Sequence, residues 1–321
     1  MPDLSARLAR LAGRWLLSGL LISLVVWLLD GETLWRELRA VSPLVIVPAL
    51  ALTLVQVVLS AWRWRYTAHR LGLCLPLQLA IQEYYLATFL NQVLPGGVLG
   101  DVNRAWRHGA SAGQRLTAVH AVAIERLSGQ LILVLVVLVS VGGLMQSSRL
   151  EPPRILQPGT ALPAVAALIL LAIALAFALK TGFFRVMLER LAGYFDRLRR
   201  DLFLALLCWP AMPVQLATSL LVLASYLGVF LCLAVGAGYL DSMGAAVVVA
   251  GLGSVLLLSM VIPLTVAGWG IREGAAAVLW PLAGLPAEQG VALSVGYGAL
   301  VFVSSLPGLA FVFTGRRRER G

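Results

Sequence analysis

Long apolar runs recur along the chain and alternate with short polar stretches. A helix needs roughly 20 mostly apolar residues to cross a bilayer. The runs that approach or reach this length predict six membrane-spanning helices, at 15–29, 43–61, 127–145, 162–179, 215–237 and 289–313. The pattern therefore predicts an all-α integral membrane protein in which residues 1–321 form a single polytopic membrane domain.

Two further apolar stretches are interrupted by helix-breaking residues. The first, 77–94, contains polar residues and runs into the sequence PGGVLGD, while the second consists of 244–262 and 271–282 separated by PLTVAGWG. Proline and glycine break a helix and free backbone N–H and C=O groups. Inside a membrane, such backbone is tolerated only in protein or against a water-filled cavity. We therefore predict two helical hairpins, near 77–118 and 244–282.

Composition and charge support a membrane protein and orient it. The chain is 60% hydrophobic and 12% charged, with a net charge of +10, whereas soluble domains carry about 25% charged residues. Arginine and lysine concentrate in cytoplasmic segments of membrane proteins, so the positive charge needs no nucleic-acid partner. The basic segments are the N-terminus, the predicted loops 62–76 and 180–201, and the tail; the segments 30–42, 146–161 and 238–243 are poor in net positive charge.

Placing the basic segments inside predicts that both termini are cytoplasmic. With six spans, this orientation is consistent only if each hairpin returns to the side from which it entered. The two hairpins are then re-entrant and open from opposite sides of the membrane.

An internal repeat falls on the same two hairpins. Residues 93–104 (VLPGGVLGDVNR) align without gaps on residues 261–272 (VIPLTVAGWGIR) at a constant offset of 168. The alignment pairs prolines, glycines and arginines: Pro95 with Pro263, Gly100 with Gly268, and Arg104 with Arg272. An inverted repeat with broken helices near the middle of the membrane is typical of secondary transporters.

The first hairpin carries candidate anion-binding groups. Its break is formed by Pro95, Gly96, Gly97 and Gly100. Freed N–H groups and a helix N-terminus attract anions, and Arg104 adds a guanidinium suited to phosphate. Asp101 is positioned in sequence to orient Arg104. A solvated cytoplasmic turn is the alternative interpretation.

Polar residues in the neighbouring segments extend this candidate site. Glu83 and Asn91 lie on one predicted helix face, and a carboxylate within an apolar helix usually faces a cavity or a partner; alternatively, Glu83 lies at the membrane interface. Glu125 and Arg126 begin the span 127–145. Adjacent residues point in different directions on a helix, so we expect one of the two to face the first hairpin.

The second hairpin carries the clearest charged pair. Arg272 and Glu273 are the only charges between Asp241 and Glu288, and apolar residues flank them on both sides. Pro263, Gly268 and Gly270 permit the irregular turn that precedes them. We expect Arg272 and Glu273 to contribute to a substrate site.

Other motifs point away from catalysis. His69, His108 and His120 lack metal-ligand spacing, and we expect neither a metal nor a cofactor. The glycine pairs lack the strand–turn–helix context of a dinucleotide site, and no catalytic constellation is apparent. Tryptophans near predicted helix ends, including Trp62 and Trp64, suggest anchoring at the membrane interface.

At these motifs the chain resembles the lysylphosphatidylglycerol synthase transmembrane-region family. That family includes the membrane half of the bacterial multiple peptide resistance factor and hopanoid-associated membrane proteins. The resemblance rests on the run 91–104, on Glu125-Arg126, and on Pro263, Gly268, Gly270, Arg272 and Glu273, and it extends over roughly residues 10–313. It implies a lipid translocase fold in a bacterial inner membrane. The aminoacyltransferase domain of larger relatives is not expected here, since only eight residues follow Phe313.

Three functions therefore compete at this stage. The favoured hypothesis is a flippase for an anionic, polyprenyl or hopanoid-type lipid, with Arg104 and Arg272 holding the head group. The alternatives are an intramembrane lipid-modifying transferase, with Asp101 and Glu125 as the available acids, and a transporter of a soluble anionic solute. The identity of the lipid, the direction of transport and the existence of a homo-oligomer stay open.

Overall fold

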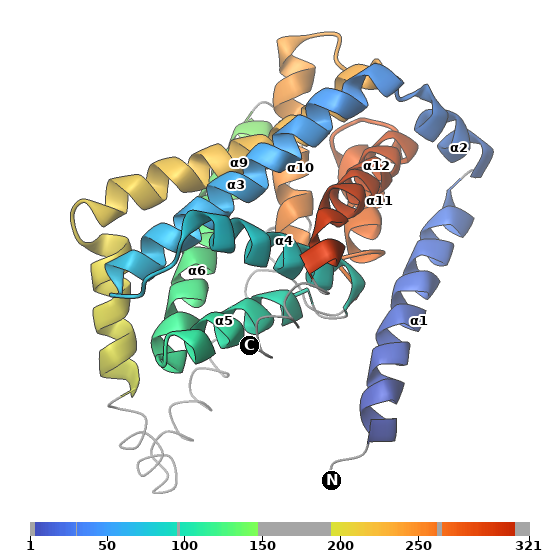
Figure 1. The fold of residues 1–321 in the computed structure, drawn as a ribbon. Coiled ribbons are helices and arrows are strands. Elements are labelled where there is room, and N and C mark those ends of the chain that lie inside the picture. Colours follow the sequence, from blue (N-terminus) through green and yellow to red (C-terminus); the bar gives the residue numbers. More distant parts are fainter. Residues whose placement is uncertain (1–3, 30, 95–96, 147–193, 262–264, 312–321) are drawn as a thin grey trace, which may run out of the picture.

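The computed structural model describes residues 4–29, 31–94, 97–146, 194–261 and 265–311 (Figure 1). These residues form helices joined by short connections, and no strand occurs within those ranges. The all-α prediction is therefore confirmed. The long helices α3 and α9 lie side by side (Figure 1), and α4, α6, α10 and α12 each pack against one or both of them.

The helices coincide with the predicted apolar runs, and several of them extend beyond these runs into the neighbouring polar residues. In chain order they are α1 (Leu4–Leu28), α2 (Gly31–Ala40), the short η1 (Pro43–Val45), α3 (Ile46–Arg70), α4 (Leu77–Val93), α5 (Leu99–Ser111), α6 (Arg115–Gln146), the π-helical turn η3 (Phe203–Leu207), α9 (Ala211–Gly236), α10 (Met243–Ser259), α11 (Ile271–Leu282) and α12 (Ala287–Ser305). Serine caps mark two of the starts: the Ser42 hydroxyl accepts from Leu44 N, and the Ser242 hydroxyl accepts from Ala245 N.

Four helical segments are long and apolar enough to cross a membrane: Pro43–Arg70, Arg115–Gln146, Ala211–Gly236 and Ala287–Phe311. A fifth candidate is the pair Trp15–Leu28 and Gly31–Ala40, which is bent by 101° at its break. These segments overlap five of the six predicted spans, and the last two residues of the span predicted at 289–313 lie outside the described residues. The sixth, 162–179, lies outside the described residues, so the count of six stays a prediction.

One predicted loop is helical instead. The basic segment 62–76 was expected to be a cytoplasmic loop, but α3 continues to Arg70. Arg63 and Trp64 are consequently buried within the protein, with exposed fractions of 4% and 0%. The expectations of a loop charge at Arg63 and an interface anchor at Trp64 are therefore wrong. Both side chains lie on the face of α3 that packs against neighbouring helices.

The two interrupted stretches each form a pair of helices. Helices α4 and α5 pack against each other, and so do α10 and α11. Apolar packing fixes both pairs. A buried cluster around Trp64 holds α4 and α5 against α3 and α6, while a larger cluster, including Phe230 stacked on Tyr297 with ring centroids 4.3 Å apart, joins α9, α10 and α12.

Helix α1 stands at one side of the bundle and packs against α11 (Figure 1). Its Ser18 hydroxyl accepts a hydrogen bond from the backbone N–H of Val266, at 3.0 Å. Val266 lies in the connection between α10 and α11, where the backbone has left helical geometry. A side chain of the first helix therefore satisfies a backbone group that the second interruption has freed.

Candidate functional site

A cavity of about 580 Å³ lies between the two interrupted helix pairs. Its walls come from both irregular connections and from α3, α4, α5, α6, α9, α10 and α12. The first connection contributes Gly97 and Val98, and the second contributes Thr265, Ala267 and Gly268. The two interruptions that the sequence predicts therefore meet at one cavity, as irregular backbone within a membrane requires.

Arg104 is fully buried behind the cavity wall, with no exposed side-chain surface. Its Nε donates to Asp101 Oδ1 at 2.9 Å, and its Nη2 donates to Glu125 Oε2 at 2.7 Å. The guanidinium also stacks on the rings of Trp64 and Tyr84, with Cζ 4.6 Å from each ring centroid. A guanidinium presents several donors in a fixed plane, so this one residue connects α5 to α3, α4 and α6.

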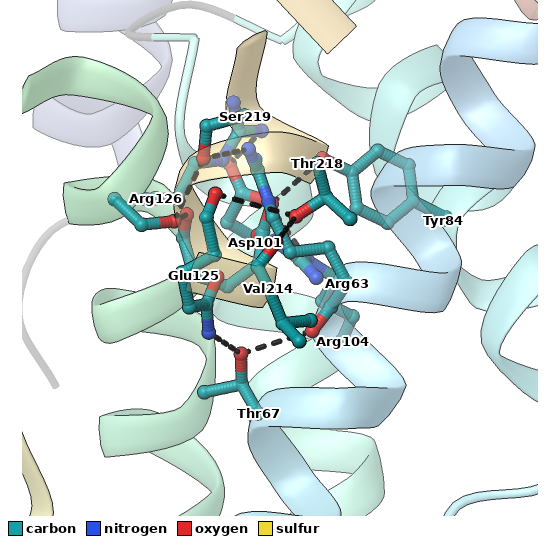
Figure 2. Close-up of polar contacts among 12 residues, drawn as sticks. Arg63, Thr67, Tyr84, Asp101, Arg104, Glu125, Arg126, Val214, Thr218 and Ser219 are labelled. Carbon is teal, nitrogen blue, oxygen red and sulfur yellow. Dashed lines mark hydrogen bonds and ion pairs between the residues drawn. The ribbon is translucent and has the colours of Figure 1, made fainter. Parts of the chain in front are cut away.

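Glu125 connects Arg104 to a second buried arginine. Arg63 on α3 donates to Glu125 Oε1 from both Nε and Nη2 (Figure 2). The Nη1 of Arg63 donates to the Ser219 hydroxyl on α9, at 2.9 Å. Tyr84 adds a longer hydroxyl contact to the same carboxylate oxygen, at 3.4 Å. Glu125 is thus enclosed by two arginines and a phenol, which compensates the cost of burying its charge.

Asp101 connects this buried cluster to the cavity. Its Oδ2 accepts from Arg126 Nη2 at 2.6 Å and from the Asn91 amide at 3.1 Å. The Asn91 carbonyl in turn accepts from the backbone N–H of Gly100, at 2.8 Å, at the start of α5. Asn91 therefore ties the end of α4 to the start of α5. Arg126 lines the cavity, and its side chain is 40% exposed.

The second pair of helices has its own buried cluster. Arg272 Nη2 donates to Glu273 Oε1 at 2.7 Å, and its Nε donates to the Ser294 hydroxyl at 2.7 Å. Glu273 also accepts from Ser294 and from the backbone N–H of Gly270. Gly270 has φ +87°, a left-handed conformation that suits glycine. This conformation directs the backbone N–H of Gly270, just before α11, toward the Glu273 carboxylate in the first turn of the helix.

The predicted site residues thus divide into two groups. Asp101, Asn91, Arg126, Gly97 and Gly268 line the cavity. The others lie behind its wall: Arg104, Arg272, Glu125 and Glu273 are fully buried, and Gly100 is buried against α4. Glu83 pairs with Arg107 at 2.9 Å and does not line the cavity. Pro95, Gly96 and Pro263 lie outside the described residues.

This arrangement changes the roles expected of the two repeated arginines. Arg104 and Arg272 have 0% and 1% exposure and are held by carboxylates and rings. Neither reaches the cavity in this conformation, so direct contact between them and a head group stays a prediction. Arg126 and Arg63 are the cations on the cavity wall among the described residues.

Sequence reasoning missed several residues of the site. Arg63 was assigned to a loop, and the roles of Tyr84, Gln56 and Gln130 were not considered. One signal was available for α3: Gln56, Ser60 and Arg63 recur at the helical spacing i, i+4 and i+7 within an apolar run. Polar residues on one face of a membrane helix indicate a cavity or a partner helix.

The charged groups around the first connection leave a net positive charge. Three arginines (Arg63, Arg104 and Arg126) are linked to two carboxylates (Asp101 and Glu125), which gives a formal excess of one. Of these three arginines, Arg126 is the most exposed, and it lines the cavity. A cavity with such a wall favours an anionic ligand.

Comparison with protein families places these features in a known context. A family model described as the lysylphosphatidylglycerol synthase TM region matches residues 15–308. The matched range includes both interrupted helix pairs and every residue of the two buried clusters. Neither the curated proteins nor the solved structures compared with the chain gave a match. The chain belongs to the lysylphosphatidylglycerol synthase TM region family.

Proposed function

We propose that the protein moves an anionic membrane lipid between the two leaflets of the membrane. The observation that carries the proposal is the cavity between the two interrupted helix pairs, with Arg126 exposed on its wall. The lipid phosphate contacts Arg126 while its acyl tails stay in the bilayer. Family membership supports a lipid-related transport role for a multi-pass membrane protein of this kind.

The same geometry argues against a lipid-modifying transferase. Such an enzyme needs an acid or nucleophile that can change its protonation or bonding during the reaction. Asp101 and Glu125 are each held by two arginines. Carboxylates bound in this way are poor bases, so these two residues favour a role in positioning the arginines.

The packing of the helices supports the predicted repeat. Helices α3 to α6 are followed by α9 to α12 at nearly the same offset: moving Leu77–Val93 forward by 168 residues gives 245–261, close to α10 at Met243–Ser259. The contacts correspond as well, since α4 packs on α5 and α5 on α6, as α10 packs on α11 and α11 on α12. Our proposal is that the two halves are inverted relative to each other, and that the two helix pairs enter the inner membrane from opposite sides.

A transport assay tests the function directly. We would reconstitute the protein in vesicles that contain phosphatidylglycerol with a fluorescent label on its tail. A quencher added outside reaches only the outer leaflet, so the rate at which the remaining fluorescence falls measures movement of the lipid from the inner to the outer leaflet. Arg126→Gln removes the more exposed of the two arginines on the cavity wall. We expect the transport rate to fall about tenfold or more, since a charge-assisted hydrogen bond contributes about 1.5–3 kcal/mol. Arg39→Gln is the matched control, because Arg39 is an exposed arginine stacked on Trp35 away from the cavity.

Three results would contradict the proposal. One is wild-type transport by Arg126→Gln, and another is equal loss in the Arg39→Gln control. The third is transport of glycerol 3-phosphate without any lipid movement, which would identify a transporter of a soluble anion.

Cysteine labelling tests the orientation. Cys74 follows α3 and is exposed, and Gln146 ends α6 and is exposed. With Cys208 and Cys232 replaced by alanine, an impermeant reagent added outside the cell should modify Gln146→Cys and spare Cys74. The opposite labelling would invert the proposed topology.

A further inference from the structure

The cavity has an opening whose rim is apolar. A residue that lines a cavity and is also exposed lies where the cavity meets its surroundings. Among the described residues that line the cavity, the exposed ones form this rim: Val98, Val102, Trp106, Val119, Ala123 and Val261. The polar side chains of the wall, Arg126 included, belong to residues that are buried or half-buried. The opening therefore presents apolar side chains to its surroundings, and the polar groups lie further inside.

Most of the rim follows two helices that pack against each other, α5 and α6. Val98, Val102 and Trp106 are spaced four residues apart, so they form one stripe along α5. On α6, Val119 and Ala123 have the same spacing, and Arg126 follows on the same face. A helix rises 1.5 Å per residue. The stripe on α5 is therefore about 12 Å long, and Arg126 lies about 10 Å along α6 from Val119.

An apolar rim distinguishes an opening into the bilayer from an opening into water. Contiguous apolar patches are rarely left exposed to water, whereas side chains that face the hydrocarbon core are apolar because polar groups there are costly. A pore for a soluble anion instead carries arginine or lysine where the anion enters. The described rim residues include neither, so they favour contact with acyl chains.

Trp106 indicates the depth of the opening in the membrane. The guanidinium of Arg115 lies over its indole ring, with Cζ 4.5 Å from the ring centroid. Tryptophan is enriched at the level of the lipid head groups, and an arginine can lay its apolar stem on hydrocarbon while its charge reaches water. Arg115 begins α6, at the end of this helix that the proposed orientation places on the cytoplasmic side. The rim then lies in the cytoplasmic leaflet.

We propose that the cavity opens sideways into the cytoplasmic leaflet through this rim, and that a lipid enters through it with the head group leading. The acyl chains stay in the bilayer and pack along Val98, Val102 and Trp106, while the phosphate reaches Arg126. The cavity of about 580 Å³ is of the size that proteins use for small ligands, so it holds a head group without taking up both tails. This inference rests on the proposed lipid transport and adds the route by which the lipid enters.

Spin-label accessibility in vesicles tests the surroundings of the rim without requiring transport. The label would be attached at Val102→Cys in the full-length protein, with the three native cysteines replaced by alanine. Oxygen is apolar and concentrates in hydrocarbon, whereas a nickel chelate stays in water. We expect the label to collide more with oxygen than with the chelate, as at Leu138→Cys, an exposed position of α6 outside the cavity. The exposed Arg199→Cys is the control for water and should show the opposite ratio.

A bulky substitution tests whether lipids pass through the rim. Ala123→Trp places an indole in the opening without crowding the core, because Ala123 is exposed. We expect lipid transport in vesicles to slow about fivefold or more, which corresponds to about 1 kcal/mol or more of added crowding for the passing lipid. Leu138→Trp is the matched control on the same helix and should transport as the wild type does.

The outcomes separate this inference from the proposed function. A label at Val102 that meets the nickel chelate as readily as one at Arg199 overturns the inference, and so does wild-type transport by Ala123→Trp or equal slowing by Leu138→Trp. If Ala123→Trp does not fold, the accessibility ratio decides, because its variant places the label at an exposed valine. A rim that faces hydrocarbon in a protein that moves no lipid would refute transport alone, whereas lipid movement with a rim that faces water would refute the lateral entrance alone.

Discussion

The Arg104→Gln variant should have a lower Tm than the Arg126→Gln variant. Both arginines bind Asp101, but they differ in burial and in the number of their contacts. Arg104 is fully buried, bridges Asp101 and Glu125, and stacks on two rings. Arg126 is 40% exposed and, within the described part of the chain, makes one ion pair, with Asp101.

The magnitude of the difference follows from these contacts. Removing one partner of a buried ion pair typically costs about 3–5 kcal/mol. Asp101 keeps Arg126 and Glu125 keeps Arg63 in the Arg104 variant, so we expect the lower end, about 3 kcal/mol. With the conversion of about 2–4 °C per kcal/mol that holds for domains of roughly 150–250 residues, Tm should fall by about 6–12 °C. The partly exposed pair of Arg126 should contribute about 1 kcal/mol or less.

Thermal unfolding of the two variants in the same detergent measures this difference. Arg104→Lys provides a second comparison, because a lysine keeps the charge but cannot bridge two carboxylates in one plane; its Tm should lie between those of the wild type and Arg104→Gln. The interpretation of Arg104 as a structural bridge is refuted if Arg104→Gln is as stable as Arg126→Gln. It is also refuted if Arg104→Lys restores the full wild-type Tm.

Two further substitutions test the helix packing, each with a matched control. Gly100→Ala would place a Cβ on a backbone carbonyl of α4 and should lower stability by about 1–3 kcal/mol, whereas Gly274→Ala on α11 has open space around it and should be neutral or stabilising; equal Tm shifts would contradict this. Ser294→Ala removes the acceptor of Arg272 Nε and should cost about 1–3 kcal/mol, while Ser304→Ala loses only a bond to its own helix and should change Tm little; similar losses in both would show that the Ser294 contact adds nothing.

The positions of the helices and of their interruptions could be predicted from the sequence. Apolar runs of sufficient length have few alternatives to a helix in a membrane, and proline and glycine mark the breaks. The ends of the helices were less predictable. Helix α3 continues through Arg63 and Trp64 because neighbouring helices surround both side chains, and hydropathy along the chain contains no information about those neighbours.

The sequence predicted which residues come together at the candidate site more successfully than it predicted what each of them does there. Arg104, Glu125 and Asp101 do come together, since polar groups within apolar segments need partners. Which arginine faces the cavity depends on side-chain direction and on packing between helices distant in sequence. Glu125 and Arg126 illustrate the point: they are adjacent in sequence, yet Glu125 is enclosed by Arg63 and Arg104 while Arg126 lines the cavity.

The hydrogen bond between Ser18 and Val266 has a consequence for synthesis of the protein. Its two partners are 248 residues apart, and translation at about 5–20 residues per second separates their appearance by roughly 12–50 s. During that interval α1 exists without the contact that it makes with Val266 in the complete chain. The ribosome therefore synthesises α1, which contacts the second interruption, long before it synthesises the interruption itself. The contact between α1 and the connection from α10 to α11 can form only after that connection has been made.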